Sequence, residues 1–151
     1  MTDAGSPGPS VVVGIDGSAG SRAALKWAAR YASATGATIR AVNAFHYPSA
    51  GPLPAGIEPK VIDDAVRADR QATLDGVVTD VFGSADPEGV TTVVAYGHPA
   101  PVLVAESEAA DLLVVGHRGH GAFNGMMLGS VSIHCVTSAR CPVVVVRGEQ
   151  D

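Results

Sequence analysis

The chain has 151 residues, 46% hydrophobic and 17% charged, which is enough to bury the core of one domain. Its net charge of -5 and its pI of about 5.4, with Lys and Arg scattered, argue against nonspecific binding to nucleic acid or to an anionic membrane. No apolar stretch approaches the roughly 18 to 20 residues of a membrane span, and the N-terminus lacks an export signal. We therefore expect a cytoplasmic protein with small-molecule or protein partners.

The first part of the chain predicts a leader and then a strand, a helix and a second strand. Residues 1–9 contain Gly, Ser and Pro and are expected to be a disordered leader, followed by one domain over 10–148. A buried strand is expected over 11–15, a turn at 16–18, a helix over about 21–35 that Gly36 caps, and a strand over about 38–44.

The rest of the chain continues the alternation. Prolines predict a loop over 46–59, and further elements are expected as helices over 60–82, 99–108 and 130–139 and strands over 90–96, 111–115 and 143–146. This pattern predicts an α/β fold with a single doubly wound, five-stranded parallel sheet, Rossmann-like, for which we expect the strand order 3-2-1-4-5.

A glycine-rich loop follows the predicted fourth strand and leads into a helix. Its glycines let backbone N–H groups approach an anion, and the helix N-terminus adds donors and a favourable dipole, so the segment predicts a phosphate site for a nucleotide. The alternative is a flexible surface crossover. The glycines are Gly116, Gly119, Gly121, Gly125 and Gly129.

In the expected strand order, Asp16 and Gly116 end neighbouring strands at the point where the order reverses, which is where such sheets bind ligands. Asp16 is a candidate for a ribose hydroxyl or a phosphate-bound Mg²⁺ through water; its alternative role is an Asx turn or helix cap. Ser130 and Ser132 are candidate phosphate donors, and the alternative for Ser130 is that it only caps the helix.

The loop lacks the lysine of a Walker motif, and the first turn is not a GxGxxG fingerprint. One carboxylate, Asp16, and one arginine, Arg118, are enough for binding and too few to predict turnover. His117 and His120 are expected to be exposed loop residues and not a metal site. No catalytic triad is expected around the other histidines, and Cys135 and Cys141 are expected to be reduced thiols.

The last predicted strand, over Val143, Val144, Val145 and Val146, falls at the edge of the sheet in this order. An exposed apolar edge favours pairing with another chain, so we expect a homodimer through these valines. The alternative is burial of the valines under a loop or helix of the same chain.

The spacing Gly116-x2-Gly119-x9-Gly129-Ser130 resembles the G-2x-G-9x-G-(S/T) nucleotide motif of the universal stress protein family. The similarity extends from Val11 to Arg147 and includes VVVGIDGS, DLLVVGHRGHG, LGSVS and CPVVVV. It implies the fold of the adenine nucleotide alpha hydrolase-like proteins, a dimer through the last strand and a role in stress or dormancy responses. The intact glycine motif implies the ATP-binding branch.

The resemblance also implies which residues hold the nucleotide. Asp16, beside Gly14, would lie near the ribose and a metal, and second-strand residues would contact adenine. The corresponding positions are Gly14, Asp16, Ala41, Val42, Gly116, His117, Arg118, Gly119, Gly129, Ser130, Val131 and Ser132. ATP, with Mg²⁺, is the expected ligand and cyclic AMP the alternative. We expect a nucleotide-dependent regulator with little turnover; the alternatives are a slow ATPase or autophosphorylating protein, and an interaction module with an idle site.

Overall fold

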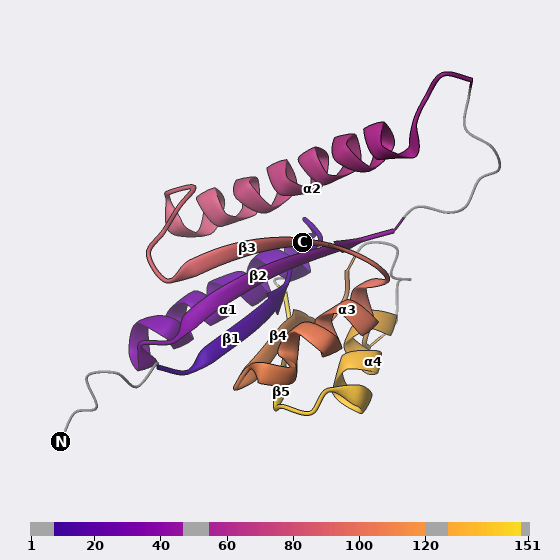
Figure 1. Ribbon diagram of the computed structural model, residues 1–151. Helices are drawn as coiled ribbons and strands as arrows, with labels where there is room; N and C mark the ends of the chain where they lie inside the picture. The colour runs from indigo at the N-terminus through magenta and orange to yellow at the C-terminus, as the bar shows by residue number, and fades with distance from the viewer. Residues whose placement is uncertain (1–7, 47–54, 120–126, 149–151) are drawn as a thin grey trace.

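Five strands and four α-helices alternate along the residues that the computed structural model describes, which are 8–46, 55–119 and 127–148 (Figure 1). The predicted alternation of elements is confirmed. The elements are β1 (Ser10–Gly14), α1 (Ala19–Thr35), β2 (Thr38–Phe45), α2 (Pro59–Phe82), β3 (Val90–Tyr96), α3 (Pro99–Glu106), β4 (Leu112–Gly116), α4 (Ser130–Ser138) and β5 (Val143–Val146).

The five strands form one parallel sheet in the order β3-β2-β1-β4-β5, as the sequence predicts. In the register of the central strands, Val13 of β1 lies opposite Ala41 of β2 on one side and Val114 of β4 on the other. The strand order reverses at β1, so the carboxyl ends of β1 and β4 are neighbours. Asp16 and Gly116 therefore leave the sheet side by side.

Two helices cover each face of the sheet (Figure 1). Alternate residues of the buried strands point to opposite faces, and each set packs under its own helix pair. The core between the sheet and the helices α1 and α2 consists of Val11, Val13, Ile15, Ala24, Leu25, Ala28, Ile39, Ala41, Leu74, Val77, Val78, Leu112 and Val114. The core between the sheet and the helices α3 and α4 consists of Val12, Val42, Leu103, Leu113, Val115 and Cys135.

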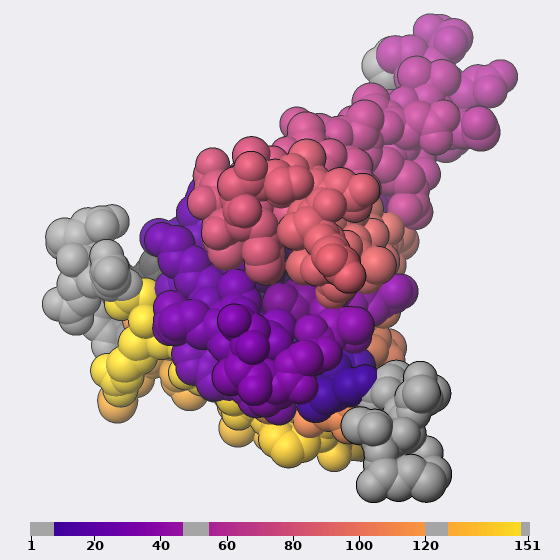
Figure 2. Space-filling view, turned by 90° about the vertical axis from the view of Figure 1, so that its left-hand side faces the viewer, coloured from indigo at the N-terminus to yellow at the C-terminus, as the bar shows by residue number. Residues whose placement is uncertain are grey.

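The long helix α2 packs into the core through its second half, whereas its first half contacts the sheet through Arg67, which reaches Val94 and Phe45. Its buried side chains are Leu74, Val77 and Val78, whereas Val61 in the first turn is 60% exposed. Figure 1 and the space-filling view of Figure 2 show the first turns of α2 projecting from the rest of the molecule. The projecting end follows the proline-rich segment, of which residues 47–54 lie outside the described part.

Helix boundaries differ from the predictions by a few residues. The first helix begins at Ala19, not near residue 21, because Ser18 is its N-cap and accepts from the Ser21 N–H; it ends as expected at Gly36, which has a φ of 77°. The third helix ends at Glu106, and a 3-10 turn takes up residues 107–109.

The expected leader lies outside the described residues up to residue 7. Its last residue, Pro9, already contacts the sheet, because its carbonyl accepts from the Thr38 N–H at 2.9 Å. Among the described helices, none combines the length and the apolar character that crossing a membrane would need.

Candidate functional site

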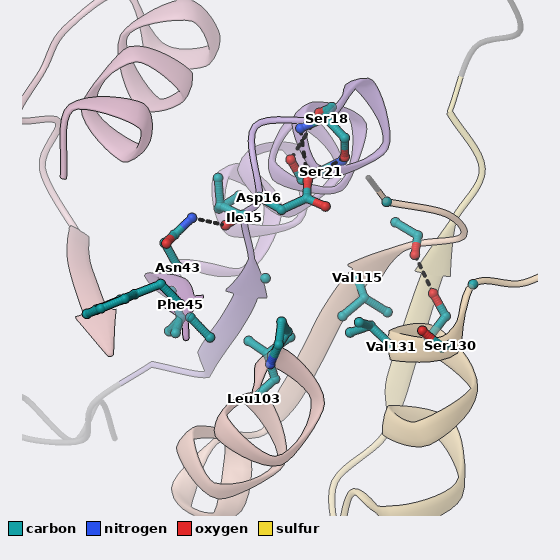
Figure 3. A pocket seen from close by; sticks show the side chains of 18 of the residues that line it. Ile15, Asp16, Ser18, Ser21, Asn43, Phe45, Leu103, Val115, Ser130 and Val131 are labelled. Atoms are coloured by element: carbon teal, nitrogen blue, oxygen red, sulfur yellow. Dashed lines mark hydrogen bonds between the residues drawn. The ribbon is translucent and has the colours of Figure 1, made fainter. Parts of the chain in front are cut away.

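A cavity of about 500 Å³ lies over the carboxyl ends of β1, β2 and β4, where the strand order reverses (Figure 3). Parallel sheets of this kind bind their ligands at this place. The residues that line the cavity are Gly14, Ile15, Asp16, Ser18, Ser21, Val42, Asn43, Ala44, Phe45, His46, Arg70, Pro99, Leu103, Val115, Gly116, Arg118, Gly119, Gly129, Ser130, Val131 and Ser132.

Asp16 leaves the end of β1 and enters the turn that starts α1. Its Oδ1 accepts from the Ser18 N–H at 2.9 Å and also from the Ser18 hydroxyl, which is the Asx turn that the sequence left open as an alternative. Its Oδ2 points across the cavity, because a Cβ built on Gly119 would lie 2.5 Å from that oxygen. The turn therefore fixes one carboxylate oxygen and holds the other against the backbone that follows β4.

The second wall, which we call the glycine side, consists of Gly116, Gly119, Gly129 and the first turn of α4. The Gly129 N–H donates to the His117 carbonyl at 2.7 Å, and the buried Ser132 hydroxyl donates to the Gly116 carbonyl at 2.6 Å. These bonds tie the start of α4 to the end of β4. The first N–H groups of a helix have no partners within the helix, so this turn is suited to an anion in the cavity.

The N-cap of α4 is Gly129, and Ser130 is the first helical residue. The alternative in which Ser130 serves as the cap is therefore wrong. The Gly129 N–H donates to the His117 carbonyl, and the helix starts one residue earlier than that alternative requires. Ser130 is left on the cavity wall, beside Val131 (Figure 3).

A close backbone contact between α1 and β4 supports the glycine side. A Cβ on Gly116 would lie 2.7 Å from the Gly20 carbonyl carbon and oxygen, and a Cβ on Gly20 would overlap the Arg118 carbonyl oxygen. Neither position has room for a side chain. Gly20 does not line the cavity, but it sets how closely the start of α1 approaches the glycine side.

Ten of the twelve residues that the sequence assigns to the nucleotide line this one cavity, and Ala41 and His117 do not. Ala41 packs in the core under α1 and α2, one residue before the part of β2 that lines the cavity, which begins at Val42. His117 instead joins elements: its backbone N–H donates to Val146 of β5 at 2.9 Å, and its ring accepts from Arg118 Nε at 3.2 Å.

The third wall, which we call the β2 side, was missed by the sequence analysis and consists of Asn43 on β2 and Arg70 on α2. The Asn43 side chain is 1% exposed, and its Nδ2 donates to the Ile15 carbonyl at 2.8 Å (Figure 3). A polar residue inside an apolar strand was a signal that would have found Asn43. Arg70 carries no such signal, since it is one of several charged residues on α2.

Two pairs of side chains that are distant or unremarkable in sequence meet in the structure. The rings of His46, at the cavity, and His98, before α3, lie 3.9 Å apart between centroids. Cys135 and Cys141 are both free thiols; burial, with a smaller contribution from Cys141, raises the pKa of Cys135 to about 11.

His120 lies outside the described residues, within which no three His, Cys, Asp or Glu side chains gather in a possible metal site.

The model of the universal stress protein family matches residues 9–147 of this chain. The chain belongs to the universal stress protein family. A universal stress protein of Mycolicibacterium smegmatis is 37% identical to it over 144 residues, which cover 92% of this chain and 48% of that protein. The chain thus spans about half the length of the curated relatives that it matches.

Solved structures of universal stress proteins share this fold. The protein UspA from Lactobacillus plantarum matches with a TM-score of 0.74 at 22% identity, over 94% of this chain and 99% of the other. A universal stress protein in complex with cAMP matches with a TM-score of 0.68 at 27% identity, over 94% of this chain and 98% of the other. The sheet order and the layers described above are therefore those of the family.

Proposed function

We propose that this universal stress protein binds an adenine nucleotide, with ATP as its main ligand, and acts as a regulator with little or no turnover. The observation that carries the proposal is the pairing of Asp16 with the glycine side across one cavity. A carboxylate suited to ribose hydroxyls faces backbone donors suited to phosphate, at the reversal point of a parallel sheet.

Relatives support the class of ligand. The structure at 27% identity is a complex with cAMP, and the same fold is seen with AMP in a protein from Arabidopsis thaliana and with dAMP in one from Archaeoglobus fulgidus. In this chain the ribose would lie by Asp16, the phosphates at Gly119, Gly129 and Ser130, and the base beside Val42. Three phosphates use more of the donors of the glycine side than one does, which favours ATP over cyclic AMP.

The residues around the cavity fit a magnesium nucleotide in a limited way. Mg²⁺ keeps several waters and takes one or two carboxylates in addition to phosphate oxygens. Asp16 is the one carboxylate that lines the cavity within the described residues, and its Oδ1 is held by Ser18. Asp16 would reach a phosphate-bound Mg²⁺ through water, with Oδ2.

The same residues favour regulation over catalysis. Phosphoryl transfer needs charged groups positioned around the phosphate that moves, together with a group that orients the nucleophile. Among the described residues, Asp16, Arg70, Arg118 and His46 are the ionisable side chains of the cavity wall, and no lysine joins them. A slow ATPase or autophosphorylating activity, with Ser130 as acceptor, is the second candidate, because Ser130 lies on the wall.

We also propose a homodimer through β5. Val143 to Val146 form the edge of the sheet, are half-buried and pair on one side with β4. An apolar edge of this kind is completed by a second copy related by a twofold axis.

The first experiment identifies any nucleotide released when the freshly purified protein is denatured. The emptied protein is then titrated with ATP and with cyclic AMP while phosphate release is followed, and Gly129→Val serves as the matched variant. We expect one ATP per chain, no turnover and no binding to a folded Gly129→Val. Tighter binding of cyclic AMP would replace ATP as the ligand, magnesium-dependent phosphate release would favour the enzyme, and absence of all binding would overturn the proposal.

A further inference from the structure

The Asn43 side chain, on the β2 side of the cavity, forms a hydrogen bond with one of its two polar atoms and not with the other. Its Nδ2 donates to the Ile15 carbonyl, whereas its buried Oδ1 has no hydrogen-bond partner. Rotating the amide by half a turn would place two acceptors, Oδ1 and the Ile15 oxygen, against each other. The bond to Ile15 therefore fixes Oδ1 as the acceptor end of this side chain, which belongs to a residue that lines the cavity (Figure 3).

Arg70, which lines the same cavity, provides the complementary atom. Its buried Nε carries an N–H group that has no hydrogen-bond partner. These two are the buried side-chain polar atoms without a partner in the described part of the chain, and both belong to residues of this one wall. Leaving such atoms unpaired costs free energy, so the pair indicates that a ligand completes this wall.

We propose that Asn43 and Arg70 select adenine by its Watson–Crick edge, with Asn43 Oδ1 accepting from the 6-amino group and Arg70 Nε donating to N1. The inference rests on the proposed function and adds to it how the adenine base is recognised. Adenine presents a donor next to an acceptor in this order. Guanine and hypoxanthine present the reverse, a carbonyl oxygen next to an N–H, and would place like groups against both side chains.

The route to these atoms runs through Arg70. Both atoms are covered by other atoms of the protein, so the edge of the base reaches them only when a side chain moves. Arg70 is half-buried at the rim on α2 and has a long side chain, whereas Asn43 is held by Ile15. Arg70 thus swings aside to admit the base and then donates to it.

The decisive experiment measures the binding of ATP, 1-deaza-ATP and 7-deaza-ATP to the wild-type protein, to Arg70→Met and to the control Arg30→Met, in which an exposed arginine of α1 is lost. We expect 1-deaza-ATP, which lacks the N1 acceptor, to bind wild type about tenfold more weakly than ATP. In Arg70→Met this ratio falls to about one. Arg30→Met keeps the tenfold ratio, and 7-deaza-ATP shows no dependence on Arg70.

The Asn43 half of the proposal is tested with purine riboside triphosphate, which lacks the 6-amino group. We expect wild type to prefer ATP over it by about tenfold and Asn43→Leu to lose that preference, with thermal melting as a separate check that the variant is folded. If ATP binds but the analogue ratios are the same in all variants, this inference is wrong and the proposed function stands. If no adenine nucleotide binds to wild type, both are wrong.

Discussion

The two walls that face each other across the cavity differ in how complete they are. On the glycine side, the hydrogen bonds from Gly129 to His117 and from Ser132 to Gly116 are formed within the protein. On the β2 side, Asn43 Oδ1 and Arg70 Nε are buried without partners. The hydrogen bonds of the glycine side are completed within the protein, and we infer that those of the β2 side are completed by the bound nucleotide.

In the proposed binding mode, the two walls differ because one binds the phosphates and the other distinguishes the base. Phosphate groups are common to all nucleotides, so a rigid arrangement of backbone donors suffices to bind them, at no cost in side-chain entropy. A base has to be distinguished from other bases, which requires side chains with a defined order of donor and acceptor. Mutations on the two walls should therefore have different effects, in strength and in kind.

After the loss of binding in Gly129→Val, the largest effect is expected from Gly20→Ala. The new methyl group would overlap the Arg118 carbonyl oxygen and push the end of β4 away from α1, so we expect ATP to bind about a hundredfold more weakly, measured by calorimetry. The control is Gly76→Ala in α2, where a Cβ meets nothing within 4 Å and should stabilise the helix by about 0.5 to 1 kcal/mol. Normal affinity in Gly20→Ala would show that the glycine side is not rigid.

The next effect concerns the edge strand, which borders the glycine side. The Leu113 N–H donates to the Pro142 carbonyl and the His117 N–H to the Val146 carbonyl, so even-numbered residues of β5 face β4 and the N–H of Val145 faces outward. Val145→Pro removes an outward donor and leaves the bonds to β4 intact. We expect this variant to be monomeric in sedimentation, with at least a thirtyfold weaker dimer.

Val145→Ala is the matched control for the edge, because it loses similar packing under α4 but keeps the N–H. It should remain a dimer. A dimer that persists in the proline variant would rule out pairing through β5.

A smaller effect is expected from Ser132→Ala. The variant removes the hydroxyl that donates to the Gly116 carbonyl and leaves a buried acceptor unpaired, which costs about 1 to 3 kcal/mol of stability in denaturant unfolding. Because Gly116 belongs to the glycine side, all nucleotides should lose affinity by the same few-fold factor, and the ratio of ATP to its 1-deaza analogue should stay unchanged. A change in that ratio would mean that the two walls are not separate.

The smallest effect is expected at Cys135, in α4. Burial raises the pKa of this thiol to about 11, so at pH 8 it is protonated as well as covered. We expect iodoacetamide to modify the half-exposed Cys141 and to leave Cys135 unmodified, with or without ATP, when mass spectrometry locates the label. Labelling of Cys135 in the empty protein alone would show that α4 opens before the ligand binds.

The fold could be predicted because its signals are local and strong. Runs such as Val11 to Val13 and Leu112 to Val115 indicate strands buried on both faces, and each alternates with a helical pattern. The position of Asp16 relative to Gly116 followed from the strand order alone. No contact between side chains was needed for either.

The parts of the site that were missed depend on which way a side chain points. The sequence treats Ala41 and Val42 alike, but Ala41 packs in the core, whereas the residues from Val42 onward line the cavity; the register of β2 against β1 and β3 sets where that change falls. Arg70 was missed because its role depends on how α2 lies over β2. Gly20 was missed because its constraint comes from the Arg118 backbone, about a hundred residues away in sequence.

Because α2 packs into the core through its second half, the two halves of this helix differ in their resistance to local unfolding. Its first turns project from the body and bury little, whereas Leu74, Val77 and Val78 hold its second half to the core. Local opening of the first half costs few buried contacts, so its amide hydrogens should exchange with solvent much faster than those after Leu74. Arg70 lies where the two halves meet, so we expect fraying of α2 and rotation of the Arg70 side chain to be coupled. The nucleotide, by holding Arg70, would slow exchange along a part of the helix that it never touches.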